Sequence, residues 1–347
     1  MFTQPASPGL PLAALRQNTD AIFNKIQTAG GTSGLDIYPS PAPSRTVLVV
    51  TTSDAPGISA VVQSGARLAA ALDGELVLHV LSPEKRSGSE VKSNEPFIAA
   101  LQRVADIVPT DRMRLGEIVR KSPHDYIRDV VAVLQPSCIV MANELSAADD
   151  FHGSSAAKAI LESCTAPLWL VSTDVGPLQP IVVAAIDDIG ARPQSNTLNR
   201  TILQNAARLS AWLDASLHVF HAAFQFDVST RILGELQQLQ RVAIAQWLHD
   251  EHVTVQEVHV PVGLADVELA KFAEIHRPCM VVAGAARLSM WKQYFHYNVT
   301  MAAAKSLSTD LLVVRQGASV LPDIGMPSSA GYGVRAAPND NSRIVLE

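Results

Sequence analysis

The sequence lacks any apolar run of the roughly 18–20 residues that a membrane-spanning helix requires, and it lacks a cluster of Lys and Arg. With a net charge of −6, it offers no basic surface of the kind that binds nucleic acids. Its three cysteines form no CxxC pair, so we predict neither a disulfide framework nor a cysteine zinc site. The first residues have neither the basic start nor the sustained apolar segment of a signal peptide. We therefore expect a cytoplasmic protein that binds neither nucleic acid nor membrane.

Motifs that carry catalysis are missing as well. The chain contains no GxSxG, no GxxxxGKS/T and no HExxH sequence, the signatures of nucleophilic serines, phosphate loops and zinc proteases. Cys138 and Cys279 lie in apolar runs, where a thiol is buried and inert. We expect no catalytic residue and no enzymatic activity.

What the chain does contain is a repeated segment. Residues 66–80 read ARLAAALDGELVLHV, and residues 207–221 read ARLSAWLDASLHVFH. Further along, PSCIVMA at 136–142 returns as PCMVVAG at 278–284. The spacing of roughly 140 residues is far longer than the roughly 20–50 residues of a solenoid repeat. It indicates a duplicated domain, and 347 residues suffice for two.

Both halves alternate β-branched apolar runs with helical patterns. The expected strands are 46–51, 75–81, 113–119, 138–142 and 168–171, then 181–186, 216–222, 253–260, 279–283 and 311–315. The expected helices are 59–71, 95–107, 123–134 and 154–163, then 197–212, 229–249, 264–275 and 299–307. This alternation requires parallel pairing with right-handed crossovers. We predict an α/β tandem duplication of two doubly wound, Rossmann-like, five-stranded parallel sheets with strand order 3-2-1-4-5.

The domain boundaries follow from these patterns. We predict an N-terminal extension over 1–44, domains over 45–175 and 178–316, and a flexible tail over 317–347. The extension contains one amphipathic pattern, at about 10–28, which favours a helix docked on its own domain over one that binds a partner.

Open parallel sheets bind ligands beyond the carboxyl ends of the strands, where the strand order reverses. In a sheet of this order, that point lies between strands one and four. After strand one, the first half has Thr51–Asp54 and the second has Asp187 and Asp188. After strand four, the halves have 142–144 (ANE) and 284–287 (GAAR).

The chain resembles the universal stress proteins, specifically their tandem members. The resemblance rests on the order of elements, the Asp after strand one, the Gly after strand four and the small residues that open the fourth helix. The resemblance covers about residues 45–316. In nucleotide-binding members of this family, strand one ends in V-D, and strand four leads into a G-x-x-G loop that is followed by G-S/T. The backbone N–H groups of those glycines hold the phosphates of ATP. The resemblance also implies that the fifth strands pair across a pseudo-two-fold axis, as an internal pseudo-dimer.

Both halves depart from the nucleotide-binding pattern. The first half has Thr52 in place of the Asp and Ala142 in place of the first loop glycine, and keeps only 153–155 (GSS) before the helix. The second half keeps the Asp and the first loop glycine. Arg287 replaces the second loop glycine, and Tyr297 replaces the glycine that opens the fourth helix. A tyrosine side chain there would occupy the phosphate volume. The candidate ligand-binding residues are Asp187, Gly263, Gly284, Arg287, Tyr297, Asn298 and Thr300.

The second half also contains an aromatic loop, MWKQYFHYN at 290–298. Its rings favour packing over their own sheet or the other domain. The alternative is an apolar pocket in place of the phosphate site, suited to an amphiphile. The small-molecule partner is therefore a nucleotide or an amphiphile, and the cofactor stays unknown, with ATP open in the second domain only.

Histidines offer one further candidate site. His218 and His221 lie on one predicted strand, and His249, His252 and His259 lie around the next, so adjacent strands could assemble a zinc site. Residues three apart on a strand face opposite sides, however. We therefore predict no metal site.

These observations favour a non-enzymatic universal stress protein with an internal pseudo-dimer and degraded nucleotide sites, which acts in stress response through a small ligand or partner. The alternative is a module that binds or slowly hydrolyses ATP through its second domain alone. An enzyme of the adenine-nucleotide hydrolase-like folds or a flavoprotein subunit would need an intact phosphate loop or flavin cradle, and neither is visible. A further homodimer stays open.

Overall fold

The structure is a computed structural model, and it describes residues 45–52, 57–81, 95–115, 123–143, 160, 164–172, 176, 178–189, 193–223, 230–285 and 307–324. The N-terminal extension and nearly all of the predicted helices 154–163 and 299–307 lie outside the described residues. Within these ranges, no helix combines the length and the apolar character needed to cross a membrane.

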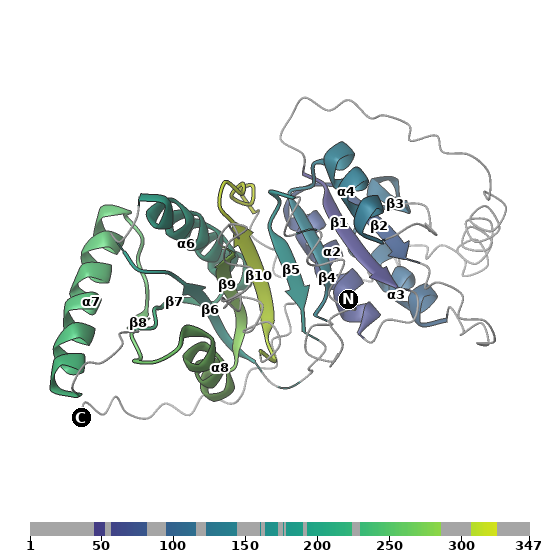
Figure 1. Ribbon diagram of the computed structural model, residues 1–347. Coiled ribbons are helices and arrows are strands. Elements are labelled where there is room, and N and C mark those ends of the chain that lie inside the picture. Colours follow the sequence, from purple (N-terminus) through teal and green to yellow (C-terminus); the bar gives the residue numbers. More distant parts are fainter. Residues whose placement is uncertain are drawn as a thin grey trace, which may run out of the picture.

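Each half alternates strands and helices along the chain (Figure 1). The first half contains β1 (Val47–Thr52), α2 (Ile58–Ala71), β2 (Leu76–Leu81), α3 (Glu95–Ala105), β3 (Met113–Leu115), α4 (Pro123–Leu134), β4 (Cys138–Ala142) and β5 (Leu168–Val171). The second contains β6 (Gln179–Ala185), α6 (Pro193–Leu213), β7 (Ser216–Phe220), α7 (Thr230–Asp250), β8 (Glu257–His259), α8 (Ala265–His276), β9 (Pro278–Ala285) and β10 (Asp310–Arg315). The predicted α/β, doubly wound class is confirmed.

All ten strands belong to one sheet, in the order β3-β2-β1-β4-β5-β10-β9-β6-β7-β8. Within each half every pairing is parallel. The two sheets expected from the sequence are continuous because β5 and β10 pair antiparallel, with Leu170 opposite Leu311 and Trp169 opposite Leu312. We call this β5–β10 contact the seam.

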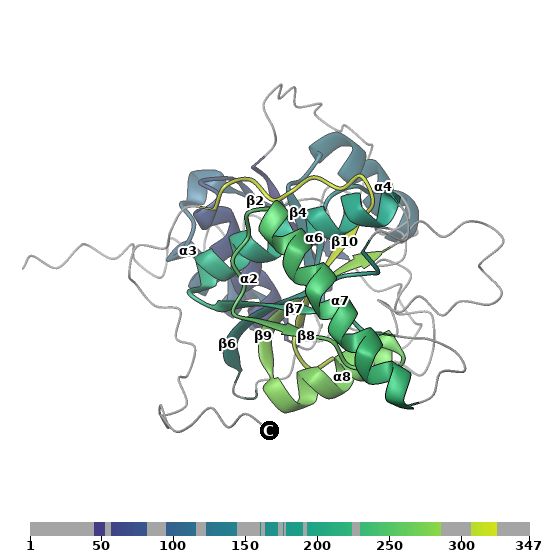
Figure 2. The ribbon, with the colours of Figure 1, turned by 90° about the vertical axis from the view of Figure 1, so that its left-hand side faces the viewer.

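Helices cover both faces of the sheet. One buried cluster joins the sheet to α2, α3, α6 and α7, and a second joins it to α4 and α8. Along β1, Val47 and Val49 belong to the first cluster, whereas Leu48 and Val50 belong to the second. Such two-sided burial explains why the strands are continuous apolar runs. Figure 2, viewed from the end of the sheet, shows α7 in front of β7 and β8.

The seam combines apolar and polar contacts between the halves. Trp169 of β5 packs edge-on against Trp212 of α6, with ring centroids 6.2 Å apart. The Trp169 Nε1–H and the Ser172 N–H donate to the two carboxylate oxygens of Asp310, at 2.9 and 2.8 Å. Burial raises the pKa of Asp310 to about 6, against the opposing effect of these two hydrogen bonds. The seam is therefore joined by specific contacts as well as by its strand ladder.

The repeated segment ends in the same turn in both copies. Asp73 follows α2 and Asp214 follows α6, each with φ of 50°, a left-handed conformation that aspartate tolerates better than most residues. The N–H of the next residue bonds back to the fifth residue before it, Gly74 to Ala69 O and Ala215 to Ser210 O, both at 2.9 Å. The shared letters ARLxAxLD therefore encode a helix together with its C-terminal cap.

The predicted strand at 253–260 is mostly wrong, because only the three residues of β8 pair within it. Val253 donates to Leu248 O at the end of α7, and both Val253 and Val255 pack against the first core cluster. The apolar alternation here reflects packing of a connecting segment and not a ladder. The predicted strand at 113–119 is described only as far as Leu115.

The approach of α2 to β1 gives the first testable prediction. A Cβ on Gly65 would lie 2.2 Å from Val49 Cγ2, and the second half has alanine at both aligned positions, Ala206 and Ala184. We expect Gly65→Ala to lower the free energy of unfolding by about 1–2 kcal/mol, because overpacking outweighs the ~1 kcal/mol that alanine gains over glycine in a helix. Adding Val49→Ala should recover part of this loss in a double-mutant cycle of urea unfolding.

Gly234 provides the control, since it lies in α7 and a Cβ there would meet nothing within 4 Å. Gly234→Ala should stabilise the protein. If Gly65→Ala stabilises it equally, the close approach of α2 to β1 is wrong.

Candidate functional site

The carboxyl ends of β6 and β9 lie side by side in the second half, at the point where strand order reverses. Their register pairs Ala185 with Ala283. Asp187, two residues after β6, and Gly284 of β9 therefore reach the same edge of the sheet. Gly263 lies further out along this edge, after a bridge between Ala223 and residue 262.

Asp187 is exposed, and its carboxylate is engaged locally. The Asp188 N–H donates to Asp187 Oδ1 at 2.8 Å, a short-range turn of the kind that aspartate favours. A ligand that needs this oxygen must compete with that hydrogen bond. The second carboxylate oxygen remains for a ribose or base donor.

Asn199 of α6 fixes the backbone of this loop, and the sequence analysis missed it. Its side chain is fully buried; its Oδ1 accepts from the Asp187 N–H and its Nδ2 donates to the Asp187 carbonyl, both at 2.9 Å. Asn199 is thus a positioning residue. Its signal in the sequence is an asparagine in helical phase with the buried Ile202, Leu203 and Ala206.

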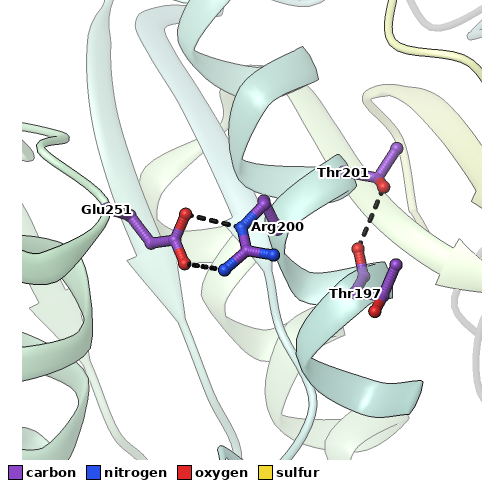
Figure 3. A network of polar contacts seen from close by, with 4 residues as sticks. All are labelled: Thr197, Arg200, Thr201 and Glu251. Atoms are coloured by element: carbon purple, nitrogen blue, oxygen red, sulfur yellow. Dashed lines mark hydrogen bonds and ion pairs between the residues drawn. The ribbon is translucent and has the colours of Figure 1, made fainter. Parts of the chain in front are cut away.

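A second contact orients the same helix from outside. Figure 3 shows the guanidinium of Arg200 forming a two-pronged pair with Glu251, with Nε–Oε2 at 2.7 Å and Nη2–Oε1 at 2.5 Å. The next residue, Thr201, donates through Oγ1 to the Thr197 carbonyl one turn earlier, at 3.0 Å. The pair ties α6 to the end of α7, although half of the Arg200 side chain is exposed, so it adds little to stability.

Gly284 has a structural reason to be glycine. A Cβ at this position would lie 2.8 Å from Leu198 Cδ2 and 2.9 Å from Ile202 Cδ1. The first turns of α6 therefore pack directly on its backbone. This close approach accounts for the glycine without any phosphate.

Gly263 is explained in the same way. Its φ is 152°, and a Cβ there would lie 2.8 Å from Glu268 Cγ. The first turn of α8, which follows it, contains Asp266 and Glu268. Two carboxylates at a helix N-terminus occupy its positive end, so this terminus is poorly suited to a phosphate.

The other candidates lie outside the described residues: Arg287, Tyr297, Asn298 and Thr300. Their assignment rests on the sequence alone. The aromatic loop at 290–298 also lies there.

The first half offers less at its corresponding edge. Ala142 is buried at the end of β4, and the N–H of the buried Asn143 donates to the Val171 carbonyl at 2.8 Å. The strand-one position is Thr52, whose backbone lies in β1. Residues 153–155 lie outside the described ranges.

The cysteine thiols have no nucleophilic character. Burial raises the pKa of Cys138 far above its usual range and that of Cys279 to about 12. Burial also raises the pKa of Cys164. All three are protonated at neutral pH, and a thiol in that form is a poor nucleophile.

The described residues also line an open groove of about 640 Å³ along α8. Its lining is formed by Asp266, Val267, Ala270, Lys271, Ala273, Glu274 and Ser308. Four of these residues are charged or hydroxylated, and the groove opens to solvent. It lacks the enclosed apolar walls that an amphiphile would need.

No protein-family model matches the chain, and no curated protein matches it in sequence. Solved structures do match it. PA1789 of Pseudomonas aeruginosa PAO1, described as functionally unknown, superposes with a TM-score of 0.58 at 17% identity, covering 79% of this chain and 93% of its own. A candidate universal stress protein of P. aeruginosa UCBPP-PA14 gives 0.58 at 17% identity, covering 78% and 93%. A universal stress protein of Archaeoglobus fulgidus gives 0.48 at 11% identity, covering 79% and 97%.

At these identities the likeness concerns architecture, and it extends over both halves and nearly the whole of the matched chains. In its fold, this chain resembles the universal stress proteins.

Proposed function

We propose that the chain is a universal stress protein that acts by binding a small ligand or a protein partner, without catalysis, and that neither half retains an intact nucleotide site. The observation that carries the proposal is the state of the carboxyl edge. Side chains of α6 occupy the space beside Gly284, and the helix after Gly263 begins with two carboxylates. In the first half, Thr52 and Ala142 replace the Asp and the first loop glycine of the nucleotide-binding pattern.

The absence of catalysis rests on the chemistry that the described residues offer. The three thiols are protonated, and the Asp187 carboxylate is held by the adjacent backbone. A general base or nucleophile needs a shifted pKa and a partner group within hydrogen-bond reach. The described part of the carboxyl edge supplies no such pair.

One observation favours the alternative, an ATP-binding or slowly hydrolysing second domain. Asn199 holds both backbone groups of Asp187, so the loop after β6 is fixed in one geometry. A preorganised loop reduces the entropy that a ligand must overcome on binding. The aligned Asp and the first loop glycine are both present there.

Calorimetric titration with ATP and Mg²⁺ distinguishes a degraded nucleotide site from an ATP-binding second domain. We expect the wild-type Kd to exceed about 1 mM, and Tyr297→Gly to tighten binding at least ~10-fold, because it removes a ring from the volume where the resemblance places the phosphates. Adding Asp187→Ala should abolish the gain.

Tyr294→Gly, in the same loop but away from the aligned glycine position, is the matched control and should leave binding weak. Micromolar binding by the wild type would contradict the degraded site, and steady release of phosphate from ATP would contradict the absence of catalysis.

A further inference from the structure

Two imidazoles and a carboxylate meet near the outer end of the sheet. His218 lies in β7, and Glu257 and His259 lie in the edge strand β8, on the left of Figure 1. The register pairs His218 with Glu257 and Phe220 with His259, and residues two apart on a strand share a face. The three side chains therefore project from one face, where Phe220 packs on Phe272 of α8.

Their ligand atoms are close to the spacing of a metal site. His218 Nδ1 lies 3.0 Å from His259 Nε2, and one ligand atom from each of His218, Glu257 and His259 lies within 4.8 Å of the others. Tetrahedral zinc with bonds of 2.0–2.1 Å places its ligand atoms about 3.3 Å apart. The imidazole pair is near this spacing already. Glu257 Oε1 lies 3.6 Å from His259 Nδ1, and the Glu257 side chain is 58% exposed, so the carboxylate has room to rotate toward the imidazole pair.

The hydrogen bonds around His218 orient its lone pair. Ser216 Oγ donates to the Pro180 carbonyl at 3.3 Å, so its oxygen is left to accept from His218 Nε2, 3.1 Å away. In this tautomer, His218 carries its proton on Nε2 and directs the lone pair of Nδ1 toward His259. A ligating histidine usually donates its other N–H in this manner.

Charged groups of both signs surround the cluster. Glu257 contributes a negative charge, whereas Arg241 of α7 and His276 of α8 oppose positive charge at His259.

We propose that His218, Glu257 and His259 form a binding site for a divalent transition metal, and that Zn²⁺ is the ion their donors match best. His218 binds through Nδ1, His259 through Nε2 and Glu257 through its carboxylate. Three protein ligands leave the fourth position for water or for an oxygen of a small ligand.

The site goes beyond the proposed function, because none of its ligands belongs to the candidate nucleotide residues. It also departs from our sequence-based prediction of no metal site, and titration with Zn²⁺ decides between the two. The prediction correctly set aside His218 with His221, whose ring lies beside the Ile186 carbonyl instead. The partners of His218 come from the neighbouring strand.

The test uses the full-length chain, stripped of metal by a chelator. Titration with Zn²⁺ should give one equivalent bound with a Kd of about 1 μM or tighter. Co²⁺ as a probe should give the intense visible absorption of a four-coordinate site. Zn²⁺ should also raise the melting temperature, because it binds the folded chain.

Variants assign the ligands. Glu257→Gln, at an exposed side chain, should weaken Zn²⁺ binding at least ~10-fold with no change in metal-free stability. His259→Ala should weaken Zn²⁺ binding by more than ~100-fold, which exceeds the usual cost of losing a group that only hydrogen-bonds a metal ligand. Ser216→Ala should cost about 10-fold, and Arg241→Gln should tighten binding. His249→Ala, on the exposed face of α7, is the matched control and should bind as the wild type does.

The proposal fails if the wild type takes up no Zn²⁺ and shows no cobalt spectrum. It fails equally if binding survives both Glu257→Gln and His259→Ala, or if His249→Ala removes it. Because Glu257→Gln leaves the core untouched, loss of folding cannot account for its effect.

Discussion

Trp169→Ala is expected to separate the unfolding of the two halves. The substitution removes the edge-on contact with Trp212 and one of the two donors to the half-buried Asp310 carboxylate. Truncating a buried tryptophan costs about 3–5 kcal/mol, and here much of that loss falls on the seam. The wild-type chain should melt in one transition by calorimetry, and the variant in two, with the first at a lower temperature.

The control removes the same volume away from the seam. Trp247 is 9% exposed and lies in α7, which packs against β8 at the end of the sheet away from the seam. Trp247→Ala should lower the melting temperature while a single transition remains. Trp169→Phe, which keeps a ring but loses the Nε1–H, should fall between wild type and Trp169→Ala. A single transition in Trp169→Ala would show that the seam does not couple the halves.

Asn199→Ala is expected to release the loop that holds Asp187. It deletes two hydrogen bonds at a fully buried position, which we expect to cost about 2–3 kcal/mol of unfolding free energy. The effect on hydrogen exchange at the loop is more specific than the loss of global stability. The Asp187 amide should exchange with deuterium at least ~10-fold faster relative to the other amides of β6, because its acceptor is gone.

Asn205 supplies the matched comparison. It lies on the same helix, is equally buried, donates to the Thr201 carbonyl and accepts from the Leu321 N–H. Asn205→Ala should lose similar stability but expose the Leu321 amide and leave that of Asp187 protected. If the two variants give the same exchange pattern, Asn199 has no specific role at the loop.

The sequence predicted the elements with strong periodicity. The helix expected over 229–249 is α7 (Thr230–Asp250), and the strand expected over 168–171 is β5. Both have long or uniformly apolar patterns that packing on one face or two faces dictates. The start of the segment 253–260 misled because Val253 and Val255 pack against the core without pairing, whereas Val258 does pair, with Val219 of β7.

The candidate site was predicted only in outline. That Asp187 and Gly284 share an edge follows from strand order, which the alternation of elements constrains. The role of Asn199 and the meeting of His218 with His259 depend on which side chains face each other across two elements. Which side chains face each other is set by how the two elements pack, and it cannot be predicted from either segment alone.

The seam also has a consequence for how the chain behaves on dilution. Only residues 172–178 separate β5 from β6, so the two partners of the seam stay tethered at an effective concentration of about millimolar, as short linkers impose. Two separate subunits with the same contacts would dissociate once diluted below their Kd. This chain completes its ten-stranded sheet by itself, and the fraction with the seam formed does not depend on how many copies are present.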